Sequence, residues 1–309
     1  MAKILITGGA GFVPSSMAEK LLLDPSNSIV LIDNFLTGFK ENIPNHPNCK
    51  FIKGDVNQYN DIEPIMCSNQ FDYVYHYAAV VGVQRTLDHP IQVLEDIQGF
   101  KNILDLSKST GVKRVFFSSS SEVYGEPVHL PQNEHTTPLN SRLPYAVVKN
   151  VGESYFRSYY QEFGLEYTIF RFFNTYGPKQ SDDFVISKFM RAAMKGNDIP
   201  IYGDGSQTRT FCYIDDNTDF CINALKDNST INQVFNVGND IIYTIYELAN
   251  LIIERTGSSS KIIQLPPLED GDMTRRQPDV TKMKNILNRD LVSLEKGIDR
   301  LIASGRFSK

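Results

Sequence analysis

Tryptophan is absent from the 309-residue sequence, cysteine is scarce, and no long hydrophobic run occurs. The four cysteines, Cys49, Cys67, Cys212 and Cys221, show neither a CxxC pair nor the spacing of a zinc site. We therefore expect no disulfide framework and no metal, and cysteines buried as small apolar side chains. Apolar stretches stay well below the roughly 18 residues of a membrane span. The N-terminus enters a strand-like segment directly, so we expect no signal peptide and a cytoplasmic location.

Charge of one sign is not concentrated anywhere in the chain. The 31 basic and 36 acidic residues give a formal net charge of −5 without a block of like charge. Without a cluster of positive charge, the sequence gives no indication of binding to nucleic acids or to anionic membranes. With 41% hydrophobic residues and dispersed Gly and Pro, the composition is that of a globular protein. The length suits one large α/β body with a smaller lobe.

Short β-branched runs alternate with longer amphipathic segments in the first two-thirds of the chain. This alternation predicts the α/β class, with a doubly wound parallel sheet covered by helices on both faces. The clearest helices are expected at Pro90–Thr110 and Tyr145–Phe163, each followed by a glycine. The predicted strands are Lys3–Thr7, Ile29–Asp33, Lys50–Lys53, Tyr73–Tyr75, Arg114–Ser118 and Tyr167–Phe172.

The regular alternation of predicted strands and helices ends at about residue 174, and Gly and Pro separate shorter elements after it. Ile231–Gly238 still reads as one more core strand. We therefore expect residues 1–173, with a further core segment near 212–238, to form the cofactor-binding domain. Residues 174–211 and 239–309 are expected to form a substrate-binding lobe.

The first predicted strand runs into Thr7-Gly8-Gly9-Ala10-Gly11-Phe12-Val13-Pro14, which precedes a predicted helix over Ser15–Leu23. Glycines here allow a tight turn and a close approach to a pyrophosphate, which the helix N-terminus attracts. Gly8, Gly11, Phe12 and Val13 are therefore candidate cofactor residues. Pro14 occupies the third glycine position, and we expect a slightly displaced helix there, because proline is tolerated in a first helical turn.

An acidic residue ends the second predicted strand. Asp33 follows Gly11 by about 20 residues, the spacing at which a carboxylate binds a ribose diol and repels a 2′-phosphate, so NAD is favoured over NADP. Gly54-Asp55-Val56 follows the third strand, and Asp55 and Val56 would flank the adenine.

Tyr145 and Lys149 are spaced as neighbours on one helix face. A nearby ammonium favours phenolate, so the tyrosine could act as a general base. The run Ser118-Ser119-Ser120-Ser121-Glu122 ends another predicted strand, at the sheet edge where open α/β folds bind ligands.

Together these motifs resemble the extended short-chain dehydrogenase/reductase family, in its nucleotide-sugar epimerase, dehydratase and decarboxylase group. The resemblance covers nearly the whole chain and implies a Rossmann-like fold that binds NAD. The matching segments are Thr7–Gly11, Asp33-Asn34, His76-Tyr77-Ala78-Ala79, Ser118–Gly125, Pro144–Lys149, Arg171–Gly177, Gly203–Asp216 and Arg276–Asp279.

The resemblance also implies roles for single residues. Tyr145 would be the base that takes a proton from the sugar 4-hydroxyl, and Lys149 would lower the pKa of Tyr145 and hold the nicotinamide ribose. Cofactor contacts would include Asn34, Ala78 and Ala79. The substrate, a nucleotide diphosphate sugar, would contact Ser120, Ser121, Asn174, Lys179, Arg209 and Arg276, with Arg209 suited to the diphosphate as a bidentate cation.

The step after the 4-keto sugar is open at this stage. A 4-epimerase, or a dehydrogenase that releases the 4-keto sugar in glycan precursor synthesis, is the main hypothesis, and Tyr145-Ala-Val-Val-Lys149 resembles epimerases. UDP-glucuronate decarboxylation is the alternative, because Glu122 stands where a base for the carbon beside the ketone would sit and Arg276 could pair with a carboxylate. Against it, Val80–Gln84 lacks the Pro- and Ser-rich motif of decarboxylases. Ser121 replaces the acid of 4,6-dehydratases, so dehydration is disfavoured, as is a non-catalytic NAD-binding protein.

The expected helix Tyr145–Phe163 is apolar over more than one stripe. A helix of this kind is buried on two sides, by its own sheet and by another surface. We therefore expect a homodimer or higher homo-oligomer.

Overall fold

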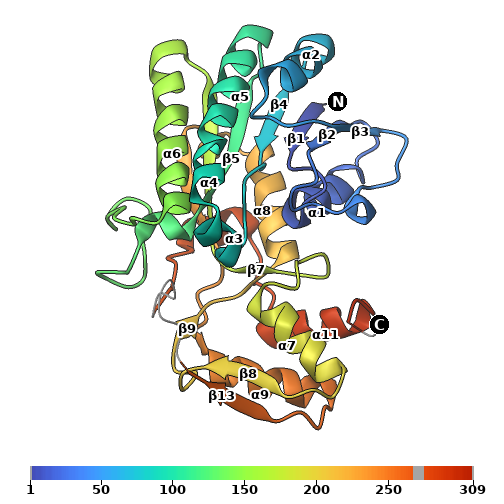
Figure 1. Ribbon diagram of the computed structural model, residues 1–309. Coiled ribbons are helices and arrows are strands. Elements are labelled where there is room, and N and C mark those ends of the chain that lie inside the picture. The colour runs from blue at the N-terminus through green and yellow to red at the C-terminus, as the bar shows by residue number, and fades with distance from the viewer. Residues whose placement is uncertain (1, 267–274, 308–309) are drawn as a thin grey trace. The chain divides into compact units, whose positions relative to one another are not determined.

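The computed structural model describes residues 2–266 and 275–307, which form two compact units (Figure 1). Each unit is assembled from separate segments of the chain. The sequence-based division places 126–138 in the cofactor-binding domain, whereas the structure groups these residues with the second unit. The first unit comprises Met1–Gly125, Leu139–Phe172 and Thr218–Phe235, and the second comprises Glu126–Pro138, Phe173–Asn217 and Asn236–Lys309.

A seven-stranded sheet forms the centre of the first unit, with strand order β11-β6-β5-β4-β1-β2-β3. All pairings from β3 to β6 are parallel, and the order reverses between β1 and β4. The predicted fold class, α/β with a Rossmann-like doubly wound sheet, is confirmed. The strands are β1 (Lys3–Thr7), β2 (Ser28–Asp33), β3 (Cys49–Lys53), β4 (Tyr73–His76), β5 (Arg114–Ser120), β6 (Glu166–Phe172) and β11 (Gln233–Val237).

Alternation along β5 places neighbouring aromatic side chains on opposite faces of the sheet. Phe117 stacks on Phe156 of one helical layer, with ring centroids 4.7 Å apart. Phe116 stacks on Tyr75 and Phe170 on the other face. These rings are fully buried, so both faces of the sheet contribute to the core.

Helices cover the sheet, and α5 and α6 lie side by side on one face (Figure 1). The predicted helix Pro90–Thr110 is broken at Glu95, where the backbone bond from Gln98 N to Glu95 O spans three residues instead of four. The helices that lie wholly or partly in this unit are α1 (Phe12–Leu21), α2 (Tyr59–Asn69), α3 (Val83–Asp88), α4 (Pro90–Leu94), α5 (Asp96–Thr110), α6 (Pro144–Phe163) and α8 (Ile214–Lys226).

The second unit consists of short strand pairs and helices. Its parallel pair β8 and β13 is covered by α7 and α9. Helix α9 begins with a capping box between Thr244 and Glu247, which satisfies two backbone donors at its start. The elements are β7 (Thr175–Tyr176), α7 (Val185–Met194), β8 (Ile199–Tyr202), β9 (Thr208–Arg209), β10 (Cys212–Tyr213), β12 (Tyr243–Thr244), α9 (Ile245–Thr256), β13 (Ile262–Leu265), α10 (Thr281–Leu287) and α11 (Leu294–Ala303).

Cysteines are free, but not all of them are buried. Cys212 and Cys221 lie in the core as expected, whereas Cys67 is exposed on α2, so that part of the prediction is wrong. Within residues 2–266 and 275–307, no three His, Cys, Asp or Glu side chains gather as metal ligands would. Over the same residues, no helix has the length and apolar character needed to cross a membrane.

Candidate active site

The glycine-rich turn joins β1 to α1 and leaves no room for side chains. Gly8 has φ +71°, and a Cβ atom there would lie 2.9 Å from the backbone nitrogen of Ala78. Gly11 N donates to Gly8 O at 2.8 Å, which closes the turn. Ala78, predicted as a cofactor residue, therefore packs directly against this turn, at the edge of the sheet where β1 and β4 end.

Helix α1 begins at Phe12, three residues before the predicted start at Ser15. Its first helical backbone bond runs from Ser15 N to Gly11 O. The N–H groups of Phe12 and Val13 precede that bond and so mark the helix end that attracts a phosphate. Pro14 sits in the first turn and offers no donor there, which is why the helix tolerates it. The first turn thus supplies two backbone donors for a pyrophosphate.

Asp33 ends β2 beside the same turn and is 9% exposed. Its carboxylate accepts hydrogen bonds from Ala10 N at 3.0 Å and from Phe35 N at 2.7 Å. Burial raises the pKa of this carboxyl, while the two backbone donors act in the opposite direction. The side chain therefore braces the glycine turn, in addition to its predicted role at the ribose.

The predicted adenine side lies between the ends of β2 and β3. Asn34 Nδ2 donates to Asp55 Oδ2 at 3.0 Å, so these two predicted cofactor residues are in contact. Val56 is buried, and its carbonyl accepts from Asn102 Nδ2 at 2.9 Å. These features together fit NAD. The glycine turn leaves space for the pyrophosphate, the start of α1 offers two backbone donors, and Asp33 offers a carboxylate at the end of β2.

Thr7 connects β1 to β4 and was not predicted as a site residue. Its Oγ1 accepts from the backbone nitrogens of Tyr77 and Ala78, each at 3.0 Å, and lies 2.9 Å from His76 Nδ1. The hydroxyl thus links the end of β1 to three groups at the end of β4. Burial lowers the pKa of His76 to about 3, which favours the neutral imidazole. A polar residue that ends a strand directly before the first glycine is the signal that could have identified Thr7.

The predicted pair Tyr145 and Lys149 lies in the first turns of α6. Lys149 is buried, and its Nζ donates to Ser118 O at 2.8 Å. The same ammonium lies 5.6 Å from the centroid of the Tyr145 ring. Desolvation lowers the pKa of Lys149 to about 8, and the charge of Asp96 acts in the opposite direction. Tyr145 is half-buried.

The serine run ends β5 next to that pair. Ser120 caps the following 3-10 turn, η2 (Ser121–Tyr124), and its Oγ accepts from Glu122 N at 3.2 Å. Ser121 is buried and Glu122 is half-buried. A phenol, a buried ammonium, a serine hydroxyl and a carboxylate thus belong to the end of β5, to η2 and to the first turns of α6, and groups of these types are suited to proton transfer.

The remaining predicted substrate residues lie in the second unit. Asn174 Nδ2 donates to Thr210 O at 3.1 Å, which places it beside Arg209 of β9. Arg209 and Arg276 are largely buried, and Lys179 is half-buried. Arg276 precedes Gln277, whose carbonyl accepts from Gln132 N at 2.7 Å. The substrate roles of these four residues stay predictions.

Asp33→Ala is expected to weaken NAD binding by about ten- to a hundredfold, since charge-assisted hydrogen bonds contribute about 1.5–3 kcal/mol each. The loss combines the ribose contacts with the brace on the Ala10 backbone. Calorimetric titration suits this measurement, because the chain has no tryptophan to report binding. The NAD affinity of Asp33→Asn, which retains one acceptor oxygen, should lie between those of the wild type and Asp33→Ala. An unchanged affinity in Asp33→Ala would place the ribose elsewhere.

Comparisons with known proteins agree with this geometry. The chain is 37% identical to UDP-glucuronic acid decarboxylase 1 of Danio rerio over 97% of its length and 72% of that protein. It is 35% identical to UDP-N-acetyl-alpha-D-glucosaminuronate decarboxylase of Bacillus cytotoxicus, covering 97% of this chain and 96% of that protein. The structure of UDP-glucose 4-epimerase from Thermotoga maritima with UDP-glucose matches with a TM-score of 0.92 and 32% identity over 98% of both chains.

The sequence-based recognition of a nucleotide-sugar enzyme that uses NAD is thereby confirmed. The model of the NAD dependent epimerase/dehydratase family matches residues 4–238, which contain the glycine turn, Asp33, Tyr145 and Lys149. The chain belongs to that family.

Proposed function

We propose that this enzyme oxidises the 4-hydroxyl of a UDP-hexuronate and then releases the C6 carboxylate as carbon dioxide. The observation that carries this proposal is the presence of Glu122 two residues after Ser120, in a chain similar to two uronate decarboxylases over almost its whole length. The sequence alone favoured epimerisation or net dehydrogenation, and the named relatives support the decarboxylase alternative better.

The first step is proton removal at the sugar. Tyr145 is proposed to take the proton of the 4-hydroxyl, because the nearby Lys149 charge would stabilise the phenolate that does so. Ser120 is proposed to hydrogen-bond the same hydroxyl. NAD, when bound, accepts the hydride from C4 and later returns it.

The second step follows from the chemistry of the 4-keto uronate, which is a β-keto acid. Its C5–C6 bond breaks, carbon dioxide leaves, and the electron pair remains as an enolate across C5, C4 and the C4 oxygen. Glu122 is proposed to take up a proton from solvent water and to pass it to C5. Arg209 is proposed to bind the diphosphate and Arg276 the uronate carboxylate, as guanidinium groups do in bidentate pairs.

A second candidate function is 4-epimerisation of the same class of substrate. The match to the Thermotoga maritima 4-epimerase favours it, as does the Tyr145-Ala-Val-Val-Lys149 sequence. In that reaction the hydride returns to the opposite face of C4, and C5 is not touched. The two functions therefore differ in whether carbon is lost.

Incubation with NAD and UDP-glucuronate, followed by mass spectrometry of the nucleotide sugar, separates these functions. Loss of one carbon dioxide supports the decarboxylase, whereas an unchanged mass with altered configuration supports the epimerase. UDP-glucose, GDP-hexoses and dTDP-glucose, tested in parallel, examine the nucleotide and the requirement for a carboxylate. Absence of carbon dioxide loss from UDP-glucuronate would overturn the decarboxylase proposal.

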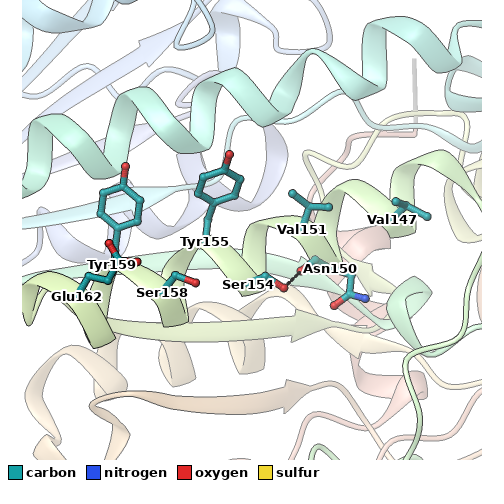
Figure 2. A pocket seen from close by; sticks show the side chains of 8 residues that line it. All are labelled: Val147, Asn150, Val151, Ser154, Tyr155, Ser158, Tyr159 and Glu162. Atoms are coloured by element: carbon teal, nitrogen blue, oxygen red, sulfur yellow. Dashed lines mark hydrogen bonds between the residues drawn. The ribbon is translucent and has the colours of Figure 1, made fainter.

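We also propose that the enzyme forms a homodimer through α6. A groove of about 420 Å³ runs along this helix, lined by Val147, Asn150, Val151, Ser154, Tyr155, Ser158, Tyr159 and Glu162 (Figure 2). Tyr159 OH donates to Asp105 of α5 at 2.7 Å, which connects one end of the groove to that helix. Val147, Tyr160 and Phe163 are at least 40% exposed in the single chain. Self-association would bury this apolar surface.

Val147→Glu is expected to shift the protein from dimer to monomer, because a carboxylate at a dimer core must be desolvated without a partner. The matched control is Val128→Glu, since Val128 is 60% exposed in the other unit and lies outside the groove. Light scattering after size-exclusion chromatography gives the mass of each variant. Equal masses for the two variants would contradict an interface at α6.

A further inference from the structure

One fully buried carboxylate collects four donors at the active-site end of the sheet. Glu153 Oε1 accepts from Ser119 Oγ at 2.7 Å and from Arg171 Nε at 2.8 Å. Its Oε2 accepts from Arg171 Nη2 at 2.7 Å and from Arg157 Nη2 at 3.0 Å. Neither Glu153 nor Arg171 is more than 1% exposed, whereas the Arg157 side chain is 44% exposed.

This cluster lies one helical turn after Lys149. Lys149 binds Ser118 O of β5, and Glu153, four residues later on α6, binds the side chain of Ser119. Helix α6 is therefore tied to the end of β5 at two successive turns. Arg171 lies directly opposite Ser119 on β6, so the guanidinium fixes the carboxylate from the neighbouring strand.

The same guanidinium extends the network to the turn that carries Glu122. Arg171 Nη1 donates to Tyr124 OH at 2.8 Å, and the guanidinium carbon lies 4.8 Å from the centroid of the Tyr124 ring. Tyr124 is buried and ends η2, the turn that begins at Ser121. Arg171 thus has one bonded connection to α6 through Glu153 and another to η2 through Tyr124.

A buried ion pair is weak evidence for stability, because desolvation of the charges offsets their attraction. The bidentate geometry instead restricts orientation, since a planar fork meets a carboxylate in few ways. Displacement of a reacting group by about 1 Å can lower a rate by about a hundredfold. A rigid network beside the reacting groups is therefore suited to holding them in place.

We propose that Ser119, Glu153 and Arg171 are positioning residues for the Tyr145–Lys149 pair, and that Tyr124 extends this control to Glu122. The network has two arms: the Ser119 arm is the bond from Ser119 to Glu153, and the Tyr124 arm is the bond from Arg171 to Tyr124. The Ser119 arm sets the register of α6 against β5, and so acts on oxidation at C4. The Tyr124 arm sets the orientation of η2, and so acts on proton delivery to C5. The second arm rests on the proposed decarboxylase function, whereas the first needs only the oxidation step.

Two mild variants and a control test the arms separately. Ser119→Ala removes one hydrogen bond to Glu153 and keeps the ion pair. Tyr124→Phe removes the hydroxyl that meets Arg171 and keeps the ring. Arg157→Gln, the control, removes the outer, half-exposed partner of the same carboxylate. Glu153→Gln is less informative, because it leaves Arg171 buried opposite a neutral partner and threatens folding.

Single-turnover absorbance with UDP-glucuronate resolves the steps, since NADH appears on oxidation and disappears when hydride returns. We expect Ser119→Ala to slow NADH appearance by on the order of tenfold, with unchanged NAD affinity. Tyr124→Phe should leave NADH appearance within about twofold of the wild type and slow its disappearance by on the order of tenfold. Deuterium uptake at C5 should slow in parallel. Arg157→Gln should match the wild type in both phases.

Each arm has a result that overturns it. The Ser119 arm is overturned if Ser119→Ala oxidises substrate as fast as Arg157→Gln does. The Tyr124 arm is overturned if both phases slow equally, or if neither changes, in Tyr124→Phe. Failure of the proposed function looks different: the wild type would then release no carbon dioxide, while the Ser119 arm remains testable with any nucleotide sugar that produces NADH. Thermal unfolding of each variant checks that the fold is retained.

Discussion

Tyr145→Phe is expected to lower the rate of substrate oxidation by about two to four orders of magnitude, the usual contribution of a general base. The ring would still fill its place beside Lys149, because only the hydroxyl is removed. NAD binding should persist, since the glycine turn and Asp33 are untouched. NADH absorbance in a single turnover measures the first effect, and calorimetric titration with NAD measures the second.

The matched control for this change is Tyr155→Phe. Tyr155 lies on the same helix, in the groove of α6, and also presents a hydroxyl (Figure 2). Its removal should leave oxidation within about twofold of the wild-type rate, since it lies outside the catalytic set. If Tyr145→Phe retained wild-type oxidation, another group would have to take the 4-hydroxyl proton.

Lys149→Met is expected to abolish turnover and yet raise the free energy of unfolding near neutral pH. Burial lowers the pKa of Lys149 from 10.5 to about 8, which corresponds to about 3 kcal/mol against holding the charge in the folded state. Methionine fills a similar volume without charge. The Ser118 carbonyl loses its donor, at about 1 kcal/mol, so about 2 kcal/mol of stabilisation should remain.

The pH dependence of that gain has a defined sign. Below pH 8 the lysine is charged in both states, so the full burial penalty destabilises the wild type. Between about pH 8 and 10.5 the unfolded chain binds more protons than the folded one, and wild-type stability rises relative to the variant. Denaturant unfolding of the NAD-free proteins at pH 7 and pH 10 should show the difference shrinking. A variant less stable than the wild type at pH 7 would contradict a charged, buried Lys149.

The strands were predictable because their signal is local. β1 was predicted with its observed bounds, and the other predicted strands end within two residues of the observed ones, because β-branched and aromatic runs mark a buried parallel sheet. The glycine turn and Asp33 were predictable for the same reason, since their spacing is short. Helix Pro90–Thr110 was less accurate, because the change of bonding at Glu95 leaves no mark in the apolar pattern.

The contacts that hold the site together were not predictable from one sequence. Thr7 meets the backbone of Tyr77 and Ala78 some 70 positions away, and Ser119 meets Glu153 across 34 positions. No periodicity encodes such pairs, because they depend on which strands become neighbours. Tyr145 and Lys149 do not separate an epimerase from a decarboxylase for a related reason: both residues would serve the oxidation that the two reactions share.

Strand β11 is synthesised long after β6, its neighbour in the sheet, and this delay affects folding of the nascent chain. It pairs with β6 at one edge of the large sheet, although residues 173–232 separate the two strands. At about 5–20 residues per second, a ribosome leaves the apolar β6 without this neighbour for several seconds. An uncovered strand edge of that kind pairs readily with other chains. Slower elongation across 173–232 should therefore increase aggregation of the nascent chain, and any fragment that stops before β11 should share that fate.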